Sequence, residues 1–161
     1  MSVKLVSLDS STTCTGVSVF VNGVYKDSYI IESDKKLKGD EKLDQMIELI
    51  FSTIKKEKPD VVVYESVMPV RNPQTTRMLQ ELTGSIRGYC VDHNISHYSI
   101  KPSEWRGLNV KRFHRSPNGR KREDLKQWSL DLVNNELGVH TESNDQSDSI
   151  LIGIGYIEMF K

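Results

Sequence analysis

The sequence predicts an α/β fold in which a five-stranded mixed sheet is flanked by helices. Valines occupy every second position from 17 to 21, and the run 61–64 is continuously apolar, as in a strand that is covered on both faces. Residues 41–56 and 75–93 repeat their apolar side chains every three or four positions, which is typical of amphipathic helices. Strands therefore alternate with helices after an opening group of strands.

The chain opens with a predicted antiparallel meander. Residues 4–8 form a short apolar strand that ends at Asp9, and residues 16–21 and 24–31 form two further strands. The pair Asn22-Gly23 between them indicates a tight type I′ turn, because such a turn needs positive φ at both central positions. A polar linker, residues 34–40, then leads to the first helix, residues 41–56, which Pro59 stops.

The second half of the chain alternates strands and helices. Strand 61–64 ends at Glu65, helix 75–93 follows, and residues 97–100 form a fifth strand. No element is predicted in the long basic segment that begins at Pro102. Helices follow at 123–137 and 145–160, and the last is apolar nearly all round, so we expect it to be buried. No repeat or Gly/Pro/Ser-rich linker divides residues 1–161, which we expect to form one domain.

The composition is that of an ordinary globular protein. The 22 basic and 22 acidic side chains cancel, and no run approaches the roughly 20 apolar residues that cross a bilayer. The first residues lack the apolar region of a signal peptide. Cys14 and Cys90 form neither a disulfide framework nor a CxxC pair, so packing is their expected role. We therefore expect a cytoplasmic protein without a membrane partner.

Positive charge gathers in one segment although the net charge is zero. Residues 101–126 carry nine Lys or Arg side chains against three acidic ones. Such an excess can bind the phosphates of a nucleic acid. A charge run is also the usual composition of a solvated surface loop, and this segment alone does not separate the two interpretations.

Four carboxylates fall at the ends of predicted elements. Asp9 ends the first strand, Glu65 ends the fourth, and Asp145 and Asp148 share a face at the start of the last helix. If the two strands are neighbours, these side chains converge at one edge of the sheet. Oxygen ligands favour hard divalent cations, Mg²⁺ or Mn²⁺, and two such ions can catalyse phosphodiester hydrolysis.

Each acid also has a structural alternative. Asp9 can cap a turn, and Asp145 and Asp148 can interact with the positive end of the helix dipole. Glu65 is harder to explain in this way, because a carboxylate that follows four buried strand residues costs solvation energy without a partner. The joint placement of the four acids favours the metal site.

The ordered set of motifs resembles the RuvC Holliday-junction resolvases of the RNase H-like superfamily. Residues 9–16 are similar to the first RuvC motif, in which a catalytic Asp ends a strand and Thr-Gly follows. Residues 61–65 resemble the second acidic motif, and residues 72–84 resemble the Asn, hydroxyl, Leu and Gly series on the helix after it. Residues 145–150 match the final motif. Residues 102–106 and the basic stretch near residues 119–121 resemble, less tightly, the region that presents lysines to DNA. The resemblance covers about residues 7–154.

This resemblance implies an RNase H-like fold and a metal-dependent, structure-specific endonuclease. It implies a homodimer that binds four-way junctions and other branched DNA and nicks two strands symmetrically, leaving 5′-phosphate ends. The metal-binding and catalytic roles fall on Asp9, Glu65, Asp145 and Asp148, which would hold two Mg²⁺ or Mn²⁺ ions, and Lys121 is the expected catalytic contact with the scissile phosphate. The expected DNA contacts are Arg71, Asn72, Arg106, Lys111, Arg112, Arg115, Arg120, Lys121 and Arg122.

Two features depart from the family pattern. Residues 66–70 lack the aromatic side chain that RuvC enzymes stack on a junction base, and the segment 107–118 is longer than in cellular enzymes. These departures and the short chain resemble a bacteriophage version. Trp105, Phe113 and His114 can stack on an unpaired base, although core packing suits Trp105 equally well.

Other functions and roles fit parts of the sequence. Residues 9–13 resemble the phosphate loop of sugar-kinase and actin-like ATPases, but those proteins need two such domains to enclose ATP. A catalytically inactive module that binds branched DNA would keep the fold, but it would not require all four acids. The apolar stripe of helix 75–93 serves either the monomer core or a dimer seam; its members are Met78, Leu82, Ile86 and Tyr89.

Overall fold

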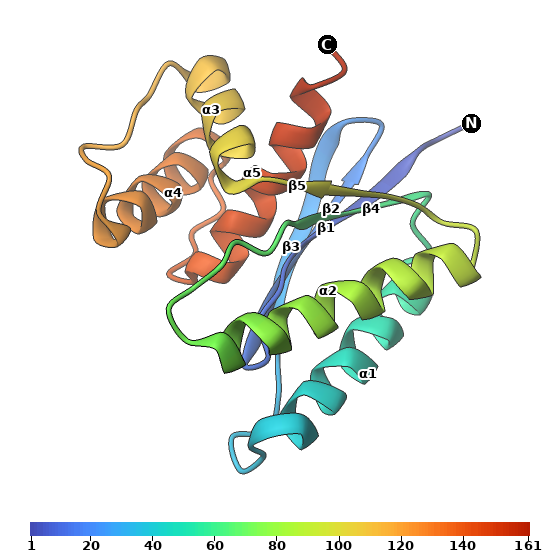
Figure 1. The fold of residues 1–161 in the computed structure, drawn as a ribbon. Coiled ribbons are helices and arrows are strands. Elements are labelled where there is room, and N and C mark those ends of the chain that lie inside the picture. The colour runs from blue at the N-terminus through green and yellow to red at the C-terminus, as the bar shows by residue number, and fades with distance from the viewer.

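The computed structural model describes all residues 1–161, and its strands form one mixed sheet (Figure 1). The strands are β1 (Lys4–Asp9), β2 (Cys14–Val21), β3 (Val24–Glu32), β4 (Val61–Glu65) and β5 (Ser96–Ile100), and they lie in the order β3-β2-β1-β4-β5. The β1–β2 and β2–β3 pairs are antiparallel, whereas β1–β4 and β4–β5 are parallel. The predicted five-stranded mixed sheet is confirmed.

Helices cover both faces of this sheet (Figure 1). On one face lie α1 (Gly39–Glu57) and α2 (Pro73–Asp92), and on the other lie α3 (Pro102–Phe113), α4 (Arg122–Leu137) and α5 (Asn144–Glu158). The helix α5 packs directly against β1 and β2, while α3 and α4 pack against α5. The prediction that the last helix is buried is confirmed, since its residues from Ser149 to Gly155 are all buried.

The hairpin turn between β2 and β3 has the predicted geometry. Asn22 has φ 51° and Gly23 has φ 77°, so both central residues are in the left-handed region that a type I′ turn requires. Asn22 also receives a hydrogen bond at its Oδ1 from the backbone N–H of Val3, 2.9 Å away. The opening meander is therefore confirmed.

The helix α3 was not predicted, since the sequence analysis assigned no element to this segment. Pro102 occupies the first turn, where its missing N–H costs nothing. The two buried residues of α3 are Trp105 and Asn109, one turn apart. The Asn109 side-chain amide donates a hydrogen bond of 2.8 Å to the Leu151 carbonyl of α5. Because the buried stripe is narrow and half of it is polar, the helix leaves only a weak apolar periodicity in the sequence.

Alternate strand residues fill two apolar cores, one on each face of the sheet. Leu8 and Tyr64 belong to the core under α1 and α2, whereas Leu5 and Val63 belong to the core under α3, α4 and α5. Trp105 is completely buried in the second core, so of its two predicted roles core packing is the correct one. On α2, Leu82 and Ile86 are buried in the monomer core, while Met78 and Tyr89 are only partly buried at its margin.

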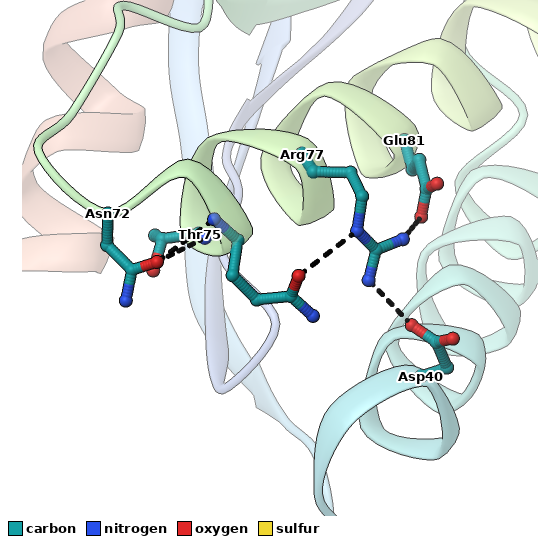
Figure 2. A network of polar contacts seen from close by, with 6 residues as sticks. Asp40, Asn72, Thr75, Arg77 and Glu81 are labelled. Atoms are coloured by element: carbon teal, nitrogen blue, oxygen red, sulfur yellow. Dashed lines mark hydrogen bonds and ion pairs between the residues drawn. The ribbon is translucent and has the colours of Figure 1, made fainter.

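A polar network fixes the start of α2 against α1 (Figure 2). The Asn72 Oδ1 accepts hydrogen bonds from the backbone N–H groups of Gln74 and Thr75, at 2.9 and 3.4 Å, and so caps the helix. The Arg77 guanidinium donates to Glu81 at 2.8 Å and to Asp40 of α1 at 3.0 Å. These contacts hold the first turns of α2, where the loop after β4 ends, against α1.

No helix has both the length and the hydropathy needed to cross a membrane.

Candidate active site

Asp9 and Glu65 emerge side by side from two neighbouring strands. In the parallel pairing of β1 with β4, Leu8 lies opposite Tyr64, so Asp9 and Glu65 occupy the next equivalent positions. Because side chains alternate along a strand, both acids point away from the core that Leu8 and Tyr64 enter and toward the layer of α3, α4 and α5. Adjacent strands lie about 4.8 Å apart. The strands are neighbours, as convergence of the two acids requires.

The start of α5 brings two further acids to the same edge. Asp9 pairs with Gly16 of β2, and the backbone of Asp145 passes directly over Gly16. Asp145 lies in the first turn of α5, and Asp148 follows one turn later on the same face. The Asp148 Oδ1 accepts a hydrogen bond of 2.5 Å from the Ser129 hydroxyl of α4, which fixes the orientation of this carboxylate.

A cleft of about 620 Å³ opens at this edge of the sheet. Three of the four acids line it, namely Asp9, Asp145 and Asp148. Glu65 does not line the cleft; its Oε2 accepts a hydrogen bond of 2.6 Å from the indole Nε1 of Trp105. The basic side chains that line the same cleft come from α3, from the segment before α4 and from α4: Arg106, Arg120, Arg122 and Lys126.

Burial disfavours the ionised form of Asp9, Glu65 and Asp148, and repulsion by other acids adds to this effect for Asp9 and Asp148. Burial raises the pKa of Asp9 well above its ordinary value, and the neighbouring charges of Asp148, Glu65 and Asp145 raise it further. Burial also raises the pKa of Asp148 to about 6, although its hydrogen bond from Ser129 opposes this change. Burial likewise raises the pKa of Glu65. Asp9 and Asp148 therefore each lie within electrostatic reach of both Glu65 and Asp145.

Arg106 is the basic side chain that acts on most of these acids. Its positive charge opposes the upward shift in the pKa of Asp9, Glu65 and Asp148. The Arg106 guanidinium lies over the Trp105 ring, 4.8 Å from the ring centroid. The Arg106 charge thus offsets part of the repulsion among the acids.

The donor atoms fit a hard divalent cation. Carboxylate oxygens are the preferred ligands of Mg²⁺ and Mn²⁺. Cys14 also lines the cleft, but burial and the adjacent Asp145 raise the pKa of its thiol to about 12, so it is a protonated neighbour. No three His, Cys, Asp or Glu side chains are arranged to hold one ion together.

The predicted DNA contacts divide into two groups. Arg106, Arg120 and Arg122 line the cleft beside the acids. The others lie outside the cleft lining: Arg71, Asn72, Lys111, Arg112, Arg115 and Lys121. Lys121, the expected catalytic cation, is exposed at the N-cap of α4, between the two arginines that do line the cleft.

Several residues outside the cleft lining have partners within the protein. Arg112 forms an ion pair of 2.7 Å with Glu158 at the end of α5, and Arg115 forms one of 2.9 Å with Glu136 of α4. Asn72 caps α2. Phe113 packs against the second core, and only His114 of the three proposed stacking residues is exposed. These contacts give structural roles to residues that the sequence assigned to DNA.

Sequence reasoning missed Lys126 and Ser129 as parts of this site. Both lie on α4, where Arg122, Lys126 and Ser129 are spaced by four and then three residues and so share one helix face. That face meets the acids, since Arg122 and Lys126 line the cleft and Ser129 binds Asp148. Helical spacing was the available signal, but no sequence feature indicated which face of α4 would meet the acids.

Comparisons with known proteins identify the fold. Sequence comparison finds neither a matching family profile nor a matching curated protein. Among solved structures, Thermus thermophilus RuvC in complex with a Holliday junction substrate superposes with a TM-score of 0.71 at 12% identity, covering 98% of this chain and 94% of that one. The chain has the RuvC-like, RNase H-like fold. The yeast mitochondrial Holliday junction resolvase Ydc2 is also similar, with a TM-score of 0.64 at 14% identity and coverage of 96% and 77%. At these identities the likeness establishes the fold alone.

Proposed function

We propose that this protein is a divalent-metal-dependent endonuclease that cuts Holliday junctions and other branched DNA. The observation that carries the proposal is the cleft itself, in which Asp9, Asp145 and Asp148 share one hollow with four basic side chains. Acidic side chains alone would repel a DNA phosphate, and basic side chains alone would bind the phosphate without cutting the DNA. The combination suits phosphodiester hydrolysis with bound cations.

The four carboxylates would hold two Mg²⁺ or Mn²⁺ ions. Bound ions of this kind activate water and neutralise the charge of a leaving oxygen. The chain supplies the rest of the chemistry. Ser129 orients Asp148, and the basic side chains bind the DNA backbone along the cleft and offset negative charge that develops on the scissile phosphate. Arg106 lowers the pKa of both Asp9 and Asp148, so its positive charge acts directly on the acids. It is therefore better placed than the exposed Lys121 to offset charge on the scissile phosphate.

Branched DNA is the substrate class that the fold supports. The similar RuvC structure holds a Holliday junction substrate, and Ydc2 is a Holliday junction resolvase. We infer that two copies of this chain act as a homodimer, since two cuts related by a two-fold axis require two related sites. Such cuts would leave 5′-phosphate ends that a ligase can seal.

Cleavage mapping on a panel of DNA structures tests this proposal. The panel consists of end-labelled four-way, three-way and flap substrates and a linear duplex of the same sequences, each incubated with Mg²⁺ or with EDTA. We expect paired nicks at symmetric positions of the four-way junction in Mg²⁺ alone, with products that ligase reseals. Binding of the junction without any nick would instead support an inactive DNA-binding module. Equal cutting of the linear duplex would contradict structure-specific cleavage.

A further inference from the structure

The completely buried side chain of Trp105 makes its only polar contact with one of the four acids. Its indole Nε1 donates a hydrogen bond of 2.6 Å to the Oε2 of Glu65, forty residues away in the sequence. An indole N–H can only donate a hydrogen bond, and an ionised carboxylate can only accept one, so the two groups are complementary. The contact therefore favours the ionised form of Glu65.

The two partners are held by different layers of the protein. Glu65 ends β4, whereas Trp105 lies in the first half of α3 and is packed against α5. A Cβ added to Gly155 of α5 would stand 2.8 Å from the Cβ of Trp105, so α3 and α5 are in close contact at this residue. Glu65 Oε1 accepts no hydrogen bond from the protein. One carboxylate oxygen of Glu65 is thus held by the indole, and the other makes no hydrogen bond within the protein.

We propose that Trp105 is a positioning residue that holds Glu65 in the orientation in which it binds a divalent cation. This inference deepens the proposed function and rests on the cation site described there. Hydrogen bonds to a metal ligand from residues behind it orient the ligand, and losing one typically weakens metal binding by about 10–100-fold. The Arg106 guanidinium lies over the ring of the same indole. The Trp105 side chain therefore contacts both an acidic and a basic residue of the site.

The chain contains its own matched control for this proposal. It has two tryptophans, and the second, Trp128, lies 6.4 Å from Trp105 in the same core. Trp128 Nε1 donates to the backbone carbonyl of Arg115 and contacts none of the four acids. Trp105→Phe and Trp128→Phe therefore remove the same group from the same core, but only the first removes a contact with Glu65.

Calorimetric titration of Mn²⁺ into the wild-type protein and both variants tests the proposal. We expect Trp105→Phe to weaken Mn²⁺ binding by roughly tenfold or more and Trp128→Phe to change it by less than about twofold. Junction binding in EDTA should be similar for all three proteins, because every basic side chain of the cleft is kept and the Phe ring at position 105 still offers an aromatic face to Arg106. Equal Mn²⁺ affinity in the two variants would overturn the proposal.

A second measurement needs only folded proteins that retain Trp105. The indole N–H signals of the two tryptophans are assigned by comparing ¹⁵N-¹H spectra of the wild type and Trp128→Phe, and Mg²⁺ is then added. We expect the Trp105 signal to shift more than the Trp128 signal; an unmoved Trp105 signal at saturating Mg²⁺ would overturn the proposal. If the wild-type protein binds Mn²⁺ but never nicks DNA, the proposed nuclease function is contradicted, while the Mn²⁺ titrations of the two variants still decide the role of Trp105. A protein that binds no divalent ion would remove both.

Discussion

Gly16 of β2 lies directly beneath the backbone of Asp145 at the start of α5. A Cβ built on Gly16 would stand 1.8 Å from the Asp145 carbonyl oxygen and 2.3 Å from its carbonyl carbon. Because Gly16 is also the sheet partner of Asp9, this contact sets how closely the acids of α5 approach the acid of β1. The Thr15-Gly16 pair in the first motif therefore has a steric reason: only glycine permits the approach.

Replacing Gly16 by Ala should destabilise the fold and separate the acids. The new methyl group would meet backbone atoms, which cannot rotate away, so α5 must shift; overpacking of this kind costs about 1–3 kcal/mol or more. Gly84→Ala is the matched control, because a Cβ at this position in α2 meets nothing within 4 Å and should stabilise the helix by about 0.5–1 kcal/mol. Urea unfolding measures both changes, and a loss of stability in both variants alike would contradict this explanation.

Replacing Asp148 by Asn should stabilise the metal-free protein at neutral pH but not at acidic pH. Burial raises the pKa of Asp148 from 3.8 to about 6, so its contribution to stability is fully present below about pH 4 and is lost as the pH rises through 6. The amide of Asn is uncharged and can still accept the hydrogen bond from Ser129. At about 1.4 kcal/mol per pKa unit, the variant should gain on the order of 3 kcal/mol at pH 7.5.

The measurement for Asp148→Asn is urea unfolding in EDTA at pH 4 and pH 7.5. The control is Asp44→Asn, which neutralises an exposed acid on α1 and should give the same difference from wild type at both values. Adding Mg²⁺ at pH 7.5 should narrow the gap between Asp148→Asn and wild type, because the ion stabilises only the ionised site. A gain for Asp148→Asn that is as large at pH 4 as at pH 7.5 would show that charge burial is not its cause.

The basic residues that line the cleft should dominate the salt dependence of DNA binding. Arg120→Ala combined with Arg122→Ala removes two cations from the cleft lining, whereas Lys111→Ala combined with Arg112→Ala removes two outside it. Each phosphate contact contributes about 0.9 to the slope of log affinity against log salt concentration. We expect the first double variant to lower the slope by roughly 2 and the second by clearly less, since Arg112 already pairs with Glu158. Equal changes would mean that DNA extends over α3 beyond the cleft.

Most of the fold could be predicted from the sequence because local patterns determine its elements. The alternating valines of β2, the turn at Asn22-Gly23 and the apolar run of β4 each specify a structure through short-range chemistry. The positions of Asp9 and Glu65 at strand ends could be predicted as well, because both directly follow apolar strand residues, whereas the pairing of β1 with β4 was a condition that only the structure met. These predictions needed no knowledge of tertiary contacts.

The remaining features depend on contacts that the sequence does not encode locally. The helix α3 buries Trp105 and the polar Asn109, so its basic residues dominated the pattern, although Pro102 at its start and Lys111 and Arg112 in its last turn are ordinary helix signals. The ion pairs that engage Arg112 and Arg115 join elements far apart in the chain. Charge counting therefore located the basic segment but did not separate the residues that line the cleft from those with partners within the protein.

The most direct test of the central claim compares wild type with Asp148→Asn on one end-labelled four-way junction. Both proteins keep the same basic side chains in the cleft, so both should bind the junction with similar affinity in EDTA. With Mg²⁺, the wild type should nick two opposing strands symmetrically, and the variant should lose at least about 100-fold in cleavage rate, which corresponds to about 2.7 kcal/mol. A wild-type protein that binds the junction but leaves it intact, or a variant that cuts as fast as the wild type, would contradict the assignment of these carboxylates to metal-dependent cleavage.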